Sequence, residues 1–256
     1  MKPISFILLF WGLINLEGEQ SKMPLNFCGE RLTFKMEYLN LSVAKLNFEV
    51  EDGPASHYHL RVHAKSIGSA SFMFRLDNVY ETYFDRQTYL PGKIVKHIHQ
   101  KNIHHELSFT FDHLRRIAQL GESISWDIPA DCFDYFSMLY FLRTQPLSLG
   151  DELSFHLDSE YIISNVKVKV MSNNQPLKVP AGKFRAIVLN LKFTRVSQPS
   201  RPWRTDLLTN RLAAPGSEVS IWISDDQDRL PLKIVYHQSS INTHIVLESF
   251  SRGRRQ

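Results

Sequence analysis

Strict alternation of apolar and polar residues is the feature that most limits what this chain can fold into. In the segment LTFKMEY (Leu32–Tyr38), every second residue is apolar. The segments AKLNFEV (Ala44–Val50) and HYHLRVHAK (His57–Lys65) repeat the pattern. Side chains along a strand point alternately to its two faces, so this period predicts half-buried strands in an antiparallel meander with one dry face.

Similar runs continue to the end of the chain at intervals of about ten residues, which is typical of sandwiches and barrels. We therefore predict an all-β, mainly antiparallel fold, a curled sheet that forms a barrel or an open half-barrel. With 256 residues and 43% hydrophobic content, the chain can bury one sizeable core or two small ones. We expect a single β-rich domain over residues 20–250 and a basic tail over 251–256. The further strand-like runs are Asp77–Phe84, Gly92–Gln100, Ile103–Asp112, Asp151–Asp158, Ile162–Met171, Phe184–Arg195, Glu218–Ser224, Leu230–Gln238 and Thr243–Phe250.

One segment, PADCFDYFSMLYFLRTQPLSLGD, has the features of a helix. Asp131 is a suitable N-cap, Asp134 follows near the positive end of the helix dipole, and Pro146 ends the helix. A helix so rich in aromatic residues must be buried, so we expect it to pack on the sheet or inside its concavity. The stripe on one side of this helix consists of Phe133, Phe136, Tyr140 and Arg143.

The segment KHIHQKNIHHELSF carries four histidines within nine residues. A hairpin that turns at Lys101–Asn102 pairs His99 with His104 and His97 with Glu106, all on the face opposite Ile98 and Phe109. Two histidines and a carboxylate on adjacent strands can bind a divalent ion. Because outward histidines recur at positions 57, 59 and 63, we favour solvated histidines and expect no metal and no cofactor.

No motif for a catalytic site is present. The sequence lacks a nucleophile elbow, a zinc-binding HExxH helix, a phosphate-binding loop and a dinucleotide-binding glycine turn. SDDQD (Ser224–Asp228) lacks the spacing of a calcium loop, and we interpret it as a polar hairpin turn. We expect no catalytic residues.

The N-terminus, MKPISFILLFWGLINLEGEQSK, predicts export. Lys2 precedes an apolar run, Ile4–Leu16, of about thirteen residues, which suits a signal peptide and is short for a bilayer span. The best small residue for cleavage is Gly18, so we expect a signal peptide over residues 1–19 and a periplasmic or envelope-associated protein. An uncleaved membrane anchor is the alternative. Cys28 and Cys132 permit one disulfide or two thiols, and the sequence leaves both open.

The net charge of +4 is modest and spread along the chain. A nucleic-acid-binding protein usually shows a dense basic stripe, so we expect no nucleic-acid partner. The long segment Arg195–Gly216 can contact anionic head groups or an envelope protein partner, or it is a solvated loop. Membrane contact is at most peripheral. The residues of this segment that suggest a contact are Arg195, Arg201, Trp203, Arg204 and Arg211.

Several segments together resemble a known family. They are GERLTFKMEY, DRQTYLPGKIVKHI, the helical segment with Asp134, Ser137, Tyr140, Arg143 and Gly150, VPAGKFRAI (Val179–Ile187), and IWISDDQDRLPLKI (Ile221–Ile234). In this order, from about Cys28 to Phe250, they resemble the domain of unknown function 3108 (DUF3108), a family of exported bacterial envelope proteins. The resemblance implies one β-rich domain, similar in outline to the half-barrels of periplasmic lipoprotein carriers. It implies no enzymatic activity.

Two functions fit these observations. The first is binding of a lipid or other apolar ligand in a half-barrel cavity, lined by Phe133, Phe136, Tyr140 and Trp222. The second is a structural or interaction role in the envelope without a small ligand; an uncharacterised hydrolase is the least favoured alternative. We also expect a structural polar cluster of Arg143, Asp225, Asp226 and Arg229. The last three would pair across a hairpin turn, and Arg143 would contact a carboxylate where the helix meets the sheet.

Overall fold

The computed structural model describes residues 25–73, 75–100, 102–197, 206, 209, 216–238 and 241–253. The expected signal peptide lies outside these residues, as do Arg201, Trp203, Arg204, Arg211 and the end of the basic tail. Within the described residues, no helix is both long enough and apolar enough to cross a bilayer.

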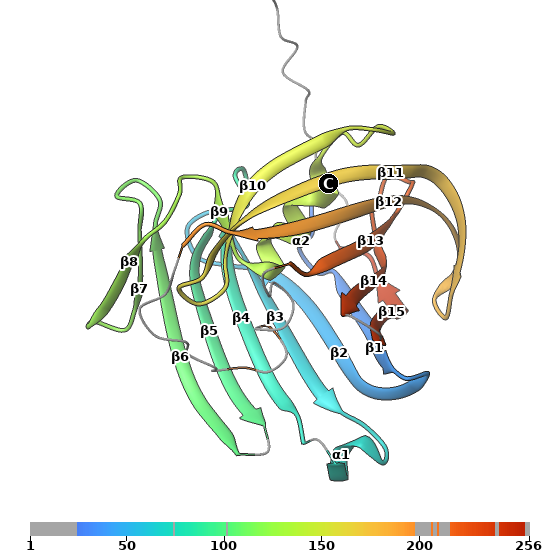
Figure 1. The fold of residues 1–256 in the computed structure, drawn as a ribbon, viewed down its shortest axis with the longest axis horizontal. Coiled ribbons are helices and arrows are strands. Elements are labelled where there is room, and N and C mark those ends of the chain that lie inside the picture. Colours follow the sequence, from blue (N-terminus) through green and yellow to red (C-terminus); the bar gives the residue numbers. More distant parts are fainter. Residues whose placement is uncertain are drawn as a thin grey trace, which may run out of the picture.

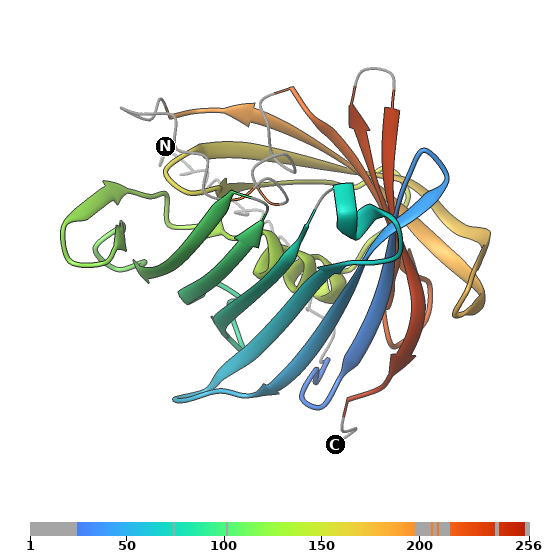
Figure 2. The ribbon, with the colours of Figure 1, turned by 90° about the horizontal axis from the view of Figure 1, so that it is seen from below.

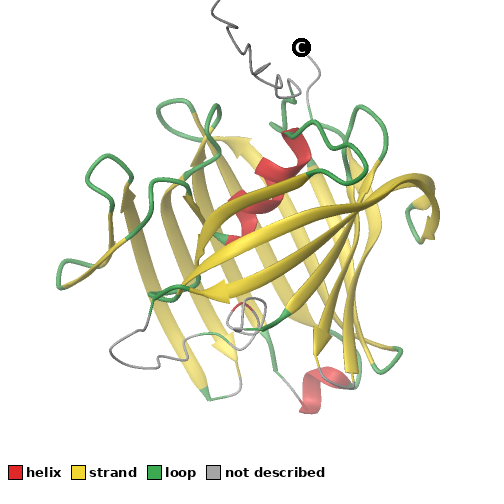
Figure 3. Ribbon diagram, turned by 45° about the horizontal axis from the view of Figure 1, so that its top comes forward, coloured by secondary structure: helices red, strands yellow, loops and turns green. Residues whose placement is uncertain are grey.

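A single sheet of fifteen strands makes up the fold (Figures 1 and 3). Its order is β8-β7-β6-β5-β4-β3-β2-β1-β15-β14-β13-β12-β11-β10-β9, so the first and last strands pair in the middle. All neighbours are antiparallel except the short β9, which runs parallel to β10. The first half contains β1 (Arg31–Tyr38), β2 (Leu41–Asp52), β3 (His57–Ser66), β4 (Asp77–Asp85), β5 (Pro91–Gln100), β6 (Ile103–Asp112), β7 (Ile117–Leu120) and β8 (Ile124–Asp127). The second half contains β9 (Cys132–Phe133), β10 (Glu152–Asp158), β11 (Ile163–Val179), β12 (Gly182–Arg195), β13 (Glu218–Ser224), β14 (Pro231–Gln238) and β15 (Ile241–Ser251).

The sheet curls around the helix α2 (Tyr135–Thr144), which lies in its concavity (Figure 2). A second helix, α1 (Ala70–Met73), is a single turn between β3 and β4. The ladder begins at β8 and ends at β9, and these two edges do not pair with each other. The predicted curled antiparallel sheet with a packed helix is therefore confirmed, in its open form.

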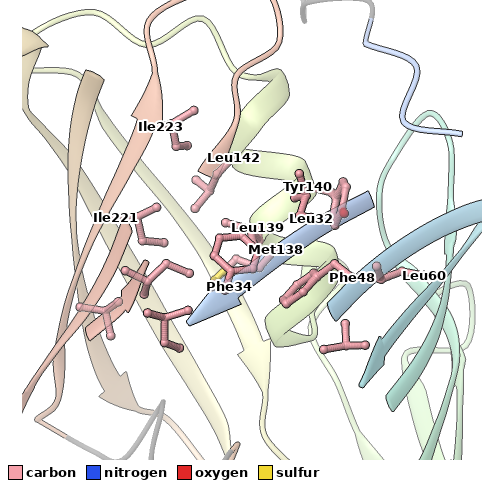
Figure 4. Packing of buried hydrophobic residues seen from close by; sticks show 14 of the residues in the cluster. Leu32, Phe34, Phe48, Leu60, Met138, Leu139, Tyr140, Leu142, Ile221 and Ile223 are labelled. Carbon is pink, nitrogen blue, oxygen red and sulfur yellow. The ribbon is translucent and has the colours of Figure 1, made fainter. Parts of the chain in front are cut away.

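Alternation decides which side chains face α2. In β3, Tyr58, Leu60, Val62 and Ala64 are buried while the residues between them are more exposed. The inner faces of the two halves meet α2 in one core (Figure 4). The side chains labelled there come from β1 (Leu32, Phe34), β2 (Phe48), β3 (Leu60), α2 (Met138, Leu139, Tyr140, Leu142) and β13 (Ile221, Ile223).

The helix begins three residues later than the sequence predicted. Asp134, not Asp131, is the N-cap, because Cys132 and Phe133 are still extended and pair with β10. The Asp134 side chain accepts hydrogen bonds from the backbone of Phe136 and Ser137, and the Ser137 hydroxyl accepts one from the Asp134 backbone. This capping box satisfies backbone groups that the first helical turn leaves unpaired.

Both cysteines are buried, and neither forms a disulfide. Of the two possibilities that the sequence left open, the structure therefore has no disulfide. Burial raises the pKa of Cys132 well above its ordinary value, and nearby Asp158 and Asp131 add to the effect. This thiol is accordingly a packing residue rather than a reactive one.

Candidate functional site

A cavity of about 60 Å³ lies between α2 and the inner face of the sheet. Its wall is almost entirely apolar, with the hydroxyl groups of three tyrosines and one threonine as the exceptions. Strands from both halves of the sheet contribute to it, so only the curled sheet creates it. The lining residues are Phe34, Leu46, Phe48, Val62, Tyr80, Tyr135, Phe136, Met138, Leu139, Phe193, Thr209, Val219, Ile221, Ile234, Tyr236 and Ile245.

A second cavity of about 20 Å³ lies beside the first turn of α2. In contrast to the larger cavity, half of its lining is polar or charged. Tyr135 and Phe136 line both cavities, so the two spaces meet at these side chains. The lining residues are Ile94, Lys96, Phe109, Phe111, Asp134, Tyr135, Phe136, Asp158, Ser159 and Glu160.

Lys96 in β5 is a charged residue on the inner face of the sheet. The sequence analysis did not predict a buried charge there. The ammonium of Lys96 lies 2.6 Å from a carboxylate oxygen of Glu160 and donates to the hydroxyl of Thr209 at 3.1 Å. Burial opposes the charge, but Glu160 and Asp206 outweigh it and raise the pKa of Lys96. This ion pair joins β5 to the turn between β10 and β11, across the gap between the two sheet edges.

Asp206 extends this polar cluster toward the larger cavity. Its carboxylate accepts hydrogen bonds from Tyr80 at 2.7 Å, Gln100 at 2.6 Å and Asn78 at 3.3 Å. The hydroxyl of Thr209 donates to the same carboxylate at 2.7 Å. Asp206 and Thr209 belong to the long segment for which the sequence suggested contact with head groups or a partner, yet both are buried inside the sheet.

Asp158, the last residue of β10, links the second half of the sheet to the edge strand β8. One of its oxygens accepts a hydrogen bond from the indole of Trp126 in β8 at 2.7 Å, and the other accepts from the backbone of Tyr161. Burial raises the pKa of Asp158 to about 7, against the opposing effect of these two hydrogen bonds. Beside it, an apolar cluster of Ala118, Ile128, Cys132 and Ile163 packs the same two edges together.

Of the four residues predicted to line a ligand cavity, the structure places only Phe136 on the larger cavity. Phe133 instead packs against Phe141 and Phe155. Tyr140 is buried at the other end of α2, where its hydroxyl donates to Glu30. Trp222 lies on the opposite face of β13, under the ammonium of Lys233, because it alternates with the inward-facing Ile221 and Ile223.

Of the residues expected in a polar cluster, Arg143 pairs with Glu30, which the sequence analysis did not name. Arg143 donates two hydrogen bonds to the carboxylate of Glu30, at 2.7 and 2.6 Å. It also donates hydrogen bonds to two backbone carbonyls of the hairpin turn, those of Asp228 and Arg229. Asp225 lies 3.9 Å from the guanidinium of Arg229, whereas Asp226 accepts hydrogen bonds from Ser224, Asp228 and Arg229 within the turn.

The histidine hairpin has the predicted register. His99 pairs with His104 and His97 with Glu106, and a ring nitrogen of His97 lies 3.4 Å from the Glu106 carboxylate. In the described part of the chain, no group of three or more histidine, cysteine, aspartate or glutamate side chains is arranged to hold a metal ion. His97, His99 and His104 lie on the outer face of the sheet, whereas His105 pairs with the inward-facing Ile98.

Comparison with solved structures shows that this fold recurs. A β-barrel-like protein from Brucella abortus, of domain of unknown function DUF1849, matches with a TM-score of 0.58 at 9% identity, covering 89% of this chain and 99% of that one. A protein from Bacteroides fragilis, described as exported with a YmcC-like fold, matches with a TM-score of 0.40 at 11% identity, covering 91% of this chain and 100% of that one. At such identities the similarity concerns the fold alone.

No curated protein gives a significant sequence match. The model of the family described as "Protein of unknown function (DUF3108)" matches residues 31–245. This range runs from the first strand into the last and contains both cavities and α2. The resemblance seen in the sequence motifs is thereby confirmed, and the chain belongs to the DUF3108 family.

Proposed function

We propose that this protein is a non-catalytic, exported protein of the cell envelope that binds an apolar, lipid-like ligand between α2 and the inner face of the sheet. The observation that carries the proposal is the larger cavity, whose wall is almost entirely apolar. Such a wall favours hydrocarbon over water, because burial of apolar surface is favourable and water would find few partners there. Export is supported by the apolar N-terminal run after Lys2.

The size of the cavity defines what it can hold. Sites for drug-sized ligands measure about 300–1,000 Å³, whereas this cavity measures about 60 Å³. As it stands, it can hold a small apolar group or the end of a hydrocarbon chain. A longer chain would have to displace side chains such as Phe136, which packs between Phe48 and Tyr80 with ring centres 5.9 and 5.4 Å away.

The polar groups near the cavity support binding rather than catalysis. Lys96 and Glu160 form an ion pair, and the Asp206 carboxylate accepts at least five hydrogen bonds from side chains and backbone. Groups held in this way fix the wall of a site.

Native mass spectrometry of the mature protein, purified from its own envelope in mild buffer, tests the proposal. We expect an additional mass that fragments as a lipid. Val219→Leu adds a methylene to the cavity wall and should reduce the bound fraction. Val168→Leu makes the same change at a buried position outside the cavity and should not. An apo mass that persists after addition of lipid extract would overturn the proposal.

The small cavity volume favours one alternative, a structural or interaction protein without a small ligand. In that case the wild-type protein binds no lipid, and Val219→Leu stabilises the fold by filling space, since a wall residue beside a cavity tolerates added volume better than a packed one. The pair of valine variants therefore separates the two functions through both bound mass and melting temperature.

A further inference from the structure

The two cavities are neighbours across the first turn of α2. Tyr135 and Phe136 contribute to both linings, and both side chains are only partly buried among the core residues. Rotation of these two aromatic rings would join an apolar space to a polar one. The combined space would have the shape that an amphiphile requires, with a hydrocarbon part at one end and a polar part at the other.

The polar end has two buried groups without a hydrogen-bond partner among the described residues, the Oδ2 atom of Asp134 and the hydroxyl of Tyr135. The Oδ1 atom of Asp134 accepts from the backbone of Phe136 and Ser137. The Oδ2 atom has no hydrogen-bond partner among the described residues, although the residue is only 3% exposed and lines the smaller cavity. A buried acceptor without a donor is costly, and a donor placed in this cavity would remove that cost.

The other charged groups of the smaller cavity already hold protein partners. The ammonium of Lys96 is held by Glu160 at 2.6 Å. Both oxygens of Asp158 accept hydrogen bonds, from Trp126 and from the Tyr161 backbone. An incoming anion would therefore meet the carboxylates of Asp134 and Asp158 without a free ammonium to balance it, which is unfavourable in a buried site.

We propose that the ligand is an amphiphile whose polar end donates a hydrogen bond to Asp134, such as a hydroxyl, amide or amine, and carries no negative charge. Its hydrocarbon part occupies the larger cavity. This inference rests on the proposed function and specifies the chemical class of the ligand. Negatively charged head groups, such as carboxylates and phosphates, are excluded from the smaller cavity, because the ammonium of Lys96 is already held by Glu160.

This inference is tested with a series of ligands that share one alkyl chain length and differ in the head group. Octanol, octylamine and octanoate compete with a neutral naphthylamine fluorophore for the purified mature protein. The measurement is made at mildly alkaline pH, because burial raises the pKa of Asp134 and the carboxylate form is the acceptor. We expect octanol and octylamine to displace the fluorophore at concentrations at least about tenfold lower than octanoate, a difference of about 1.4 kcal/mol.

Asp134→Asn is the decisive variant. Asparagine caps a helix as well as aspartate does, so its oxygen can keep the bonds to Phe136 and Ser137 while an NH₂ group replaces the free acceptor. The preference should then shift from octanol toward octanoate. Asp131→Asn is the matched control, since Asp131 lies before the helix, half exposed and paired with His156, and it should leave the preference unchanged.

The outcomes separate the inference from the proposed function. If no member of the series displaces the fluorophore, and no lipid copurifies, the binding function itself is wrong. If all three bind equally, or octanoate binds best to the wild-type protein, binding stands and the assignment of a donating head group is wrong. The wild-type series gives this answer even if Asp134→Asn does not fold.

Discussion

The guanidinium of Arg143 and the carboxylate of Glu30 form two parallel hydrogen bonds, 2.7 and 2.6 Å long, in the interior of the protein. Their side chains are 1% and 5% exposed. The pair ties the last turn of α2 to the residue before β1, and the hydroxyl of Tyr140 adds a third hydrogen bond to Glu30. Near the first turn of α2, the Lys96–Glu160 pair is buried as well, so an ion pair lies near each end of the helix.

Breaking the Arg143–Glu30 pair should strongly destabilise the fold. Arg143→Met leaves the Glu30 charge buried without its main partner, a change that typically costs about 3–5 kcal/mol. The double variant with Glu30→Met removes both charges and should be more stable than Arg143→Met alone. Urea unfolding measures both. As a control, Lys169→Met removes an exposed pair with Glu152 and should cost less than about 1 kcal/mol.

The position of the helix cap leads to a second prediction. Asp134→Ala removes the acceptor of two backbone hydrogen bonds and should lower the free energy of unfolding by about 0.5–2 kcal/mol. Asp131→Ala removes only the partially exposed contact with His156 and should have a smaller effect. Thermal melts of the two variants, compared side by side, check the assignment of Asp134 as the N-cap of α2. Equal destabilisation by both would contradict it.

Asp158 should make stability depend on pH. Its pKa is 3.8 in the absence of the fold and about 7 in it, so the folded protein holds this proton more tightly than the unfolded chain. The resulting stabilisation is fully present below the unfolded pKa and is lost as the pH rises through about 7. Across this window the loss is at most about 4 kcal/mol.

The measurement compares urea unfolding of the wild-type protein and Asp158→Asn across this pH range. The wild-type protein should lose stability relative to the variant as the pH rises. Asp127→Asn changes an exposed carboxyl on β8 nearby and serves as the control. Parallel pH profiles for wild type and Asp158→Asn would show that this carboxyl does not titrate in the expected range.

Phe136 should control the length of chain that the interior accepts. Phe136→Leu shortens a side chain that lines both cavities, and the space that it opens joins them. We expect affinity for longer alkyl chains to rise relative to shorter ones, as measured with a series of alcohols in the displacement assay. Phe133→Leu changes a ring in β9, just before α2, that lies outside both linings, so it should not change this ratio.

Much of the fold could be predicted from the sequence because alternation reports directly on burial. The register of His97 with Glu106 and of His99 with His104 followed from the assumed two-residue turn and is confirmed. The same reasoning, applied consistently, would have placed Trp222 correctly, because it alternates with Ile221 and Ile223. The prediction of Trp222 as a cavity residue gave more weight to the size of the side chain than to its position in the alternating pattern of the strand.

The interior polar cluster could not be predicted in the same way. Lys96 lies between inward-facing Ile94 and Ile98, which marks it as buried, but its partner Glu160 comes from a turn far away in the sequence. Glu30 likewise precedes the first strand and meets Arg143 only in the folded chain. Pairing between distant charges depends on how the sheet curls, and alternation carries no information about curvature.

The pairing of β1 with β15 has a consequence for how this chain reaches its fold. Each half of the sheet can assemble from hairpins between sequential strands, but their union must wait until the last strand is available, and such remote contacts slow folding. The two ends of the described chain meet in space, since a Cβ on Gly253 would lie 2.7 Å from the carbonyl oxygen of Cys28. A circular permutant that joins these ends and opens the chain between β8 and β9 would turn the most remote pairing into a hairpin, and it should refold faster than the natural order of strands.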